Sequence, residues 1–171
     1  MGLRAVPVGF AALGHDVIYL EDTRLWPVYQ RAGADPADCS ENVAHLAAVM
    51  RHFGLDKRWA YRDETSGRCF GMSATELDEV CRTADVFVNI SRSTVLREQY
   101  RRIPVRVLID SDPMFTQIQY VTQEMFTPGV SAIREMVAGH THHVTFGENI
   151  GGADCRVPDA GVHWQPTRRR R

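Results

Sequence analysis

The chain has few cysteines, a single lysine and none of the familiar catalytic motifs. Its four cysteines are scattered without a C-x-x-C pair: Cys39, Cys69, Cys81 and Cys155. This arrangement favours reduced thiols in a cytoplasmic protein over a disulfide framework. Lys57 is the only lysine among 20 basic residues, which we interpret as coding bias. The sequence contains no nucleophile elbow, Ser-His-Asp order or H-E-x-x-H motif, and we expect no cofactor.

Long apolar runs are also missing. None approaches the ~20 residues that a membrane-spanning helix requires, so we expect no membrane span. The N-terminus contains Arg4 but lacks the apolar core and cleavage site of a secretory signal. The formal net charge is -1, although Arg168–Arg171 add four positive charges at the end. The remaining body is therefore acidic, which argues against a nucleic-acid partner.

The segment Ala84–Pro113 indicates the fold class. It contains two runs rich in valine and isoleucine, Val86–Ile90 and Val105–Ile109, joined by the polar segment Thr94–Arg102. Neither run alternates polar with apolar residues, which is typical of buried parallel strands. With Thr94–Arg102 as a crossover helix, the segment forms a βαβ unit. We therefore predict an α/β fold with a Rossmann-like parallel sheet flanked by helices. Its 171 residues suit one domain over residues 1–167, with a basic C-terminal tail over residues 168–171.

The rest of the chain alternates between similar elements. We expect helices over residues 6–13, 40–53, 74–84, 114–125 and 131–138, and strands over residues 17–20, 59–62, 68–71 and 143–146. Ser40 is a predicted N-cap, and Ser73 with Glu76 forms a capping box. Arg24–Asp38 and the chain from Gly147 onward are predicted loops. No strand pattern precedes the first helix, so we expect an incomplete first βα unit.

Two acidic residues, Asp110 and Asp112, directly follow the second predicted strand of the βαβ unit. In open α/β sheets, ligands bind at the carboxyl edge of the strands. A carboxylate there can orient a sugar hydroxyl, act as a base or hold a metal. For Asp112 we slightly favour a different role, as the cap of a helix that begins near Pro113. Both interpretations stay open for these residues.

Further polar residues follow the neighbouring predicted strands. Asn89, Ser91 and Ser93 end the first strand of the βαβ unit, where they either line the ligand crevice or, as we favour, cap the next helix. The glycine-rich segment Gly147–Gly152, which contains Glu148, follows the last predicted strand. It has no lysine and no P-loop spacing, so an ordinary surface loop is the default and a phosphate cradle the alternative.

The only histidine cluster comprises His140, His142 and His143. Asp154 and Cys155 are close in sequence, but no second ligand pair has recognisable zinc spacing, so we expect no metal. His143 opens an apolar strand and is suited to packing. His140 and His142 lie in the preceding loop and are candidates for contact with a substrate.

Several segments resemble a known family. The sequence of Gly14–Asp22 (GHDVIYLED) resembles the segment that follows the first helix in N-terminal domains of GT-B-type glycosyltransferases. Arg102–Pro113, His140–Gly151 and Trp164–Thr167 resemble segments of a bacterial group of glycosyltransferase-like proteins. With gaps, the resemblance extends from about Gly9 to Thr167.

This resemblance implies a function in glycosyl transfer. GT-B enzymes pair two Rossmann-like domains, of which the N-terminal one receives the acceptor and the C-terminal one binds the nucleotide-sugar donor without a metal. The chain would then supply the acceptor side, truncated at both ends, and would need a donor-binding domain as partner. We expect Asp110, Asp112 and His142 to act in catalysis, with Asp110 the first choice as base, and Asn89, Ser91, His140 and Glu148 to contact a sugar or other small-molecule acceptor.

Two alternatives remain open. The first is a non-catalytic Rossmann-like binding or scaffold domain that associates with itself, as a homo-oligomer, or with a partner, because a missing strand exposes backbone groups and apolar surface. The second is a small nucleotide-binding protein.

Overall fold

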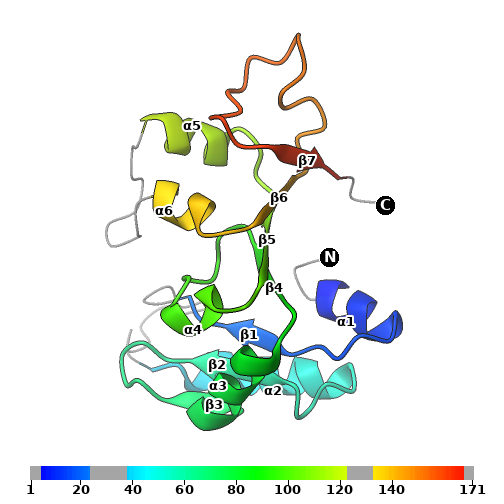
Figure 1. Cartoon of the computed structure of the whole chain (residues 1–171). Coiled ribbons are helices and arrows are strands. Elements are labelled where there is room, and N and C mark those ends of the chain that lie inside the picture. Colours follow the sequence, from blue (N-terminus) through cyan, green and yellow to red (C-terminus); the bar gives the residue numbers. More distant parts are fainter. Residues whose placement is uncertain (1–4, 24–37, 123–132, 168–171) are drawn as a thin grey trace. The chain divides into compact units, whose positions relative to one another are not determined.

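A computed structural model describes residues 5–23, 38–122 and 133–167 (Figure 1). The chain divides into two compact units, residues 1–80 and 81–171, with the boundary inside a helix. Each compact unit is described separately below. The single domain over residues 1–167 stays a prediction from the sequence. Most of the predicted loop Arg24–Asp38 and the basic tail Arg168–Arg171 lie outside the described residues.

The first unit contains a small mixed sheet. Its elements are α1 (Ala5–Ala12), β1 (Tyr19–Glu21), α2 (Ser40–His52), β2 (Trp59–Arg62), β3 (Cys69–Gly71) and the start of α3 (Ala74–Thr83). Strand β2 is central, parallel to β1 and antiparallel to β3. The core joins α2 to β2 and consists of Leu46, Met50, Leu55, Trp59 and Tyr61. These large buried side chains, each worth about 1.5–3 kcal/mol of burial, hold the unit together.

The local signals predicted in this unit are mostly confirmed. Gly14 follows α1 in a left-handed conformation with φ +88°, which ends the helix before β1. Ser73 and Glu76 form the predicted capping box, in which the Glu76 carboxylate accepts from the Ser73 N–H at 2.7 Å and Ser73 Oγ accepts from the Glu76 N–H at 3.2 Å. The predicted N-cap Ser40 is wrong, because Ser40 is the first helical residue and its N–H donates to Asp38 Oδ1.

The second unit is built on a four-stranded sheet in which every strand is parallel. Its elements after α3 are β4 (Val86–Ile90), α4 (Glu98–Arg101), β5 (Val105–Asp110), α5 (Phe115–Thr122), α6 (Ile133–Ala138), β6 (His142–Thr145) and β7 (Trp164–Pro166). The strand order is β4-β5-β6-β7. This arrangement confirms the predicted α/β fold with a Rossmann-like parallel sheet flanked by helices.

Two details of this unit differ from the prediction. Helix α4 has four residues, shorter than the predicted Thr94–Arg102. The Asn89 side chain bonds both backbone groups of Thr94, which holds the start of that segment outside the helix. Strand β7 falls in a predicted loop. It has only three residues and contains Pro166, and proline is tolerated at a sheet edge because no neighbouring strand needs its missing N–H.

Helices α4, α5 and α6 lie on one face of this sheet (Figure 1). Leu108 of β5 packs there with Ile133 and Val137 of α6 and with Trp164 of β7. Alternate residues of a strand share a face, so Asp110 points to the same side as Leu108. The sheet thus directs Asp110 toward the helices at the end of β5.

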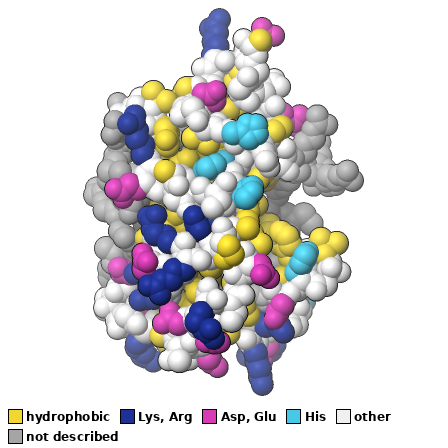
Figure 2. Space-filling model, viewed as in Figure 1, with side chains coloured by type: hydrophobic (Ala, Val, Ile, Leu, Met, Phe, Trp, Pro, Cys, Tyr) yellow, Lys and Arg dark blue, Asp and Glu magenta, His cyan; other side chains and the backbone are white. Residues whose placement is uncertain are grey.

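Charge on the surface is mixed in sign. On the face that Figure 2 displays, acidic and basic side chains of the described residues lie intermixed. None of the four cysteines forms a disulfide, and Cys81 is buried.

Candidate functional site

The carboxyl ends of β4, β5 and β6 meet at one edge of the parallel sheet. Ile90 pairs with Ile109, and Asp110 pairs with Thr145. The structure therefore brings five of the predicted site residues to the same edge: Asn89, Ser91, Asp110, Asp112 and Glu148. Ligands of open α/β sheets bind at this edge.

Asp110 is fully engaged by its neighbours. It is 1% exposed and accepts from Thr116 Oγ1 at 2.7 Å, Gln117 Nε2 at 2.8 Å and Thr145 Oγ1 at 3.0 Å. The backbone N–H of Asp112 donates to it at 3.3 Å. Four donors match the roughly four lone-pair positions of a carboxylate, so none is left to take a proton from a substrate. Asp110 ties the first turn of α5 and the end of β6 to β5.

Asn89 also has a structural position. It is 1% exposed, its Nδ2 donates to the Thr94 carbonyl at 2.8 Å, and its Oδ1 accepts from the Thr94 N–H at 3.2 Å. Both ends of the amide are therefore used to shape the loop that leads from β4 to α4.

The backbone at the end of β4 is strained. Ser91 and Arg92 are consecutive non-glycine residues in the left-handed region, with φ 54° and φ 60°. Such conformations cost about 1–3 kcal/mol each and cluster at functional sites. The hydroxyls of Ser91 and Ser111 form a short hydrogen bond that joins the ends of β4 and β5. Two hydroxyl groups therefore lie together at the carboxyl edge.

Arg92 is the feature of this edge that sequence reasoning missed. Its Nη1 donates to Gln119 Oε1 of α5 at 2.8 Å, while its buried Nε has no hydrogen-bond partner. Burial lowers the pKa of the Arg92 guanidinium below its ordinary value, and the charges of Asp110 and Asp112 oppose that shift. The available signal was its position directly after the strand, where a side chain is directed into the crevice.

The remaining predicted residues of this edge are exposed. The side chains of Asp112 and Glu148 face solvent. Helix α5 begins at Phe115, and its first turn is held by Gln117, whose Oε1 accepts from the Met114 N–H at 2.7 Å. The Asp112 carboxylate is thus placed to meet a solute.

The glycine-rich loop after β6 has a packing explanation. A Cβ atom on Gly147 would lie 2.5 Å from the Ile150 side chain and 2.9 Å from Pro113 Cβ, so only glycine fits. Turns rather than a helix follow Gly147. The geometry therefore matches the surface loop that the sequence favoured over a phosphate cradle.

His140 and His142 lie at the opposite edge. His142 is the first residue of β6 and pairs with Val107, so it lies toward the amino end of the sheet. The expectation that His142 shares a site with Asp110 and Asp112 is therefore wrong, because a loop that precedes a parallel strand lies at the amino edge.

His140 precedes β6 and is buried. It is 4% exposed, and its Nδ1 donates to the Met136 carbonyl at 2.7 Å, while Nε2 is buried without a partner. Burial lowers the pKa of His140 to about 4. Its position favours a core histidine over one that contacts substrate.

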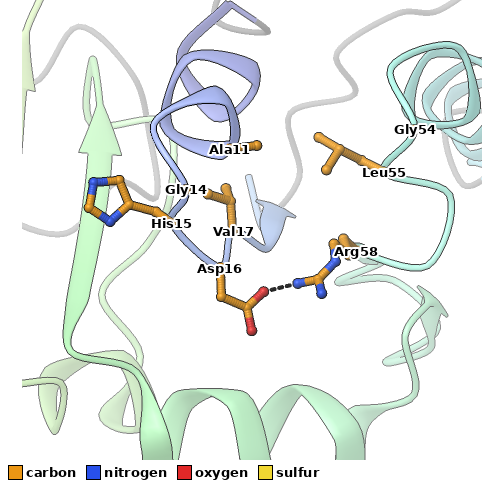
Figure 3. Close-up of a pocket in the computed structure, with 8 residues that line it drawn as sticks. All are labelled: Ala11, Gly14, His15, Asp16, Val17, Gly54, Leu55 and Arg58. Carbon is orange, nitrogen blue, oxygen red and sulfur yellow. Dashed lines mark ion pairs between the residues drawn. The ribbon is translucent and has the colours of Figure 1, made fainter.

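A hollow in the first unit is a second location to consider. It encloses about 360 Å³ and is lined by Ala11, Gly14, His15, Asp16, Val17, Gly54, Leu55 and Arg58 (Figure 3). Asp16 and Arg58 form an ion pair across it. His15 packs edge-on against Phe10, with ring centroids 5.7 Å apart. Because its charged groups are paired with each other, the hollow is a weaker candidate than the carboxyl edge.

Residues 5–23, 38–122 and 133–167 contain neither a metal-binding cluster nor a membrane-spanning helix. In those ranges, no three side chains of His, Cys, Asp or Glu gather to hold a metal ion. None of the helices there has both the length and the apolar character to cross a membrane.

Comparisons with protein-family models, with curated proteins and with solved structures found no match to this chain. The resemblance to glycosyltransferases therefore rests on the sequence segments alone.

Proposed function

We propose that the chain supplies the acceptor side of sugar transfer from a nucleotide sugar, as the N-terminal domain of a GT-B-type glycosyltransferase does. The observation that carries this proposal is the gathering of hydroxyl and carboxylate groups at the carboxyl edge of three adjacent parallel strands. Ser91 and Ser111 follow β4 and β5, and Asp112 and Glu148 lie in the next loops. Sugars are recognised by such groups because each hydroxyl of the ring both donates and accepts.

Asp112 takes the role of base that the sequence assigned first to Asp110. The Asp110 carboxylate is occupied by four donors, whereas Asp112 faces solvent. In an inverting reaction, a carboxylate at hydrogen-bond distance from the acceptor hydroxyl removes its proton during attack. Asp110 then acts as a positioning residue that fixes the loop carrying Asp112, and His142 takes no part. The donor sugar is supplied by a separate donor-binding domain.

Acceptor binding tests this proposal without a donor. Saturation-transfer NMR with a panel of mono- and disaccharides should detect binding to the wild-type chain, weakened in Ser91→Ala and Asp112→Asn. Asp78→Asn removes an exposed carboxylate from α3 and is the matched control, expected to bind like the wild type. Absence of binding across the panel, or equal binding by Asp112→Asn, contradicts the proposal.

One observation favours the alternative of a non-catalytic binding or scaffold domain. The sheet face opposite Leu108 is lined by Val86, Val88, Ile90, Val105, Val107 and Ile109, of which Val86 is 50% exposed and the other five are half-buried. Exposed apolar sheet surface is typical of contact with another chain. Analytical ultracentrifugation separates the two functions, since a monomer at tens of micromolar contradicts obligatory association.

A further inference from the structure

The half-buried guanidinium of Arg92 has few partners among the described residues. It has one hydrogen bond, to Gln119, and its buried Nε has none. Within the described residues it forms no direct ion pair, although the charges of Asp110 and Asp112 act on it. Arg92 is half-buried, and even partial burial of a charge is costly unless the charge is paired and hydrogen-bonded. The arrangement points to a ligand from outside the chain that accepts hydrogen bonds from the guanidinium.

The groups around Arg92 suit an oxyanion. Ser91 and Ser111 share one hydrogen bond, and a pair of hydroxyls has two protons, so one proton stays available to a ligand. The left-handed turn at Ser91 and Arg92 sends the arginine side chain across to Gln119 of α5. A planar guanidinium with neighbouring hydroxyls is a common arrangement for binding phosphate.

The neighbouring acids set limits on this site. The negative charge of Asp110 is stabilised by hydrogen bonds from three side-chain donors. Asp112 is exposed, and its negative charge repels an approaching anion across solvent. Binding must therefore come from direct hydrogen bonds and not from a broad positive field. The ligand is expected to be a small molecule that carries one phosphate group, and not a polyanion.

We propose that Arg92, Ser91 and Ser111 form a binding site for the phosphate group of a phosphorylated small molecule. Phosphate binding at this site does not depend on sugar transfer. Combined with the proposed function, it specifies the acceptor as a phosphorylated sugar. Free phosphate and a phosphorylated sugar present the same oxyanion, and the experiment distinguishes them.

The test uses three probes on the full chain: inorganic phosphate, glucose 6-phosphate and glucose. Thermal unfolding and ³¹P line broadening of the wild type should show saturable binding of both phosphate compounds. Arg92→Met keeps the length of the side chain and removes its charge. It should weaken phosphate binding at least about tenfold, since charge-assisted hydrogen bonds are lost. It should also unfold at a higher temperature than the wild type when phosphate is absent, because a half-buried charge without a direct ion-pair partner has been removed.

Two further variants complete the design. Arg134→Met is the control, because Arg134 is an exposed arginine of the same unit that contacts Tyr120, and it should bind phosphate like the wild type. The double variant Ser91→Ala, Ser111→Ala leaves Arg92 in place and should weaken phosphate binding about tenfold.

The outcomes separate this inference from the proposed function. The phosphate site is overturned if the wild-type chain binds neither phosphate compound, or if Arg92→Met binds them as tightly as the wild type does. So does a loss of stability in Arg92→Met, which would make the guanidinium a structural group. Glucose binding that persists in these cases leaves the acceptor role standing. Phosphate binding without any response to a sugar removes the acceptor role and keeps the anion site.

Discussion

Replacing Asp110 should destabilise the protein strongly, because its carboxylate organises the carboxyl edge. Asp110→Ala leaves the side chains of Thr116, Gln117 and Thr145 without their acceptor, and each of these is 1% exposed or less. An unsatisfied buried polar group costs about 1–3 kcal/mol. Gln117 Oε1 and Thr145 Oγ1 still accept from the backbone N–H groups of Met114 and Gly147, but the donors of these two side chains lose their acceptor. We expect a total of about 3–5 kcal/mol.

The conservative variant should cost less. Asp110→Asn keeps the shape and one acceptor oxygen, but its NH₂ group faces a donor, so the expected cost is about 1–3 kcal/mol. Urea denaturation followed by far-UV circular dichroism measures both values. Asp112→Ala is the control, and as an exposed residue it should change the free energy of unfolding by less than about 0.5 kcal/mol.

Two results would refute this reasoning. One is wild-type stability in Asp110→Ala, which would mean that the hydrogen bonds to Asp110 contribute nothing. The other is a folded and stable Asp110→Asn that binds acceptor normally but transfers no sugar when a donor domain is supplied. That result would return the role of base to Asp110.

The remaining predictions concern His140 and two glycines. His140 has a pKa of about 4 when folded and about 6.5 when unfolded, so the unfolded chain takes up its proton first. Stability should be complete above pH 6.5 and fall as the pH drops toward 4, by about 2 kcal/mol at pH 5. His140→Leu should remove most of this loss in urea titrations at pH 7 and pH 5, and an unchanged pH dependence would contradict it. Gly147→Ala should cost about 1–3 kcal/mol because its Cβ meets Ile150 and Pro113. Gly9 lies in α1, and a Cβ atom added there would have no atom within 4 Å, so Gly9→Ala should instead stabilise the protein by about 0.5–1 kcal/mol. If both glycine variants change the stability in the same direction, the packing argument fails.

The sheet could be predicted because its central strands carry a strong and local signal. Val86–Ile90 was predicted with its observed bounds, and Val105–Ile109 falls one residue short of the end of β5. Burial on both faces selects valine and isoleucine at consecutive positions, and the polar segment between the runs is long enough for the crossover that parallel strands need. Strand β7 had no such signal, since three residues between turns do not form a pattern.

The site was only partly predictable, because its roles depend on contacts between distant segments. The sequence placed Asp110 at the carboxyl edge, but its engagement depends on Thr145, which is 35 residues away. Arg92 was missed because the left-handed turn that places it has no glycine to mark it. His142 was assigned to the wrong edge because its loop precedes a parallel strand. The direction of a strand decides which edge a flanking residue occupies.

The central claim is that the carboxyl edge of β4, β5 and β6 is where this protein meets its ligand. The most direct test follows the backbone amide chemical shifts in ¹H–¹⁵N NMR spectra during titration with glucose 6-phosphate or with a saccharide from the panel that binds. The account predicts that the largest changes occur at Ser91, Arg92, Ser111 and Asp112. Changes centred on His142 at the amino edge, or on His15 in the hollow of the first unit, would contradict it.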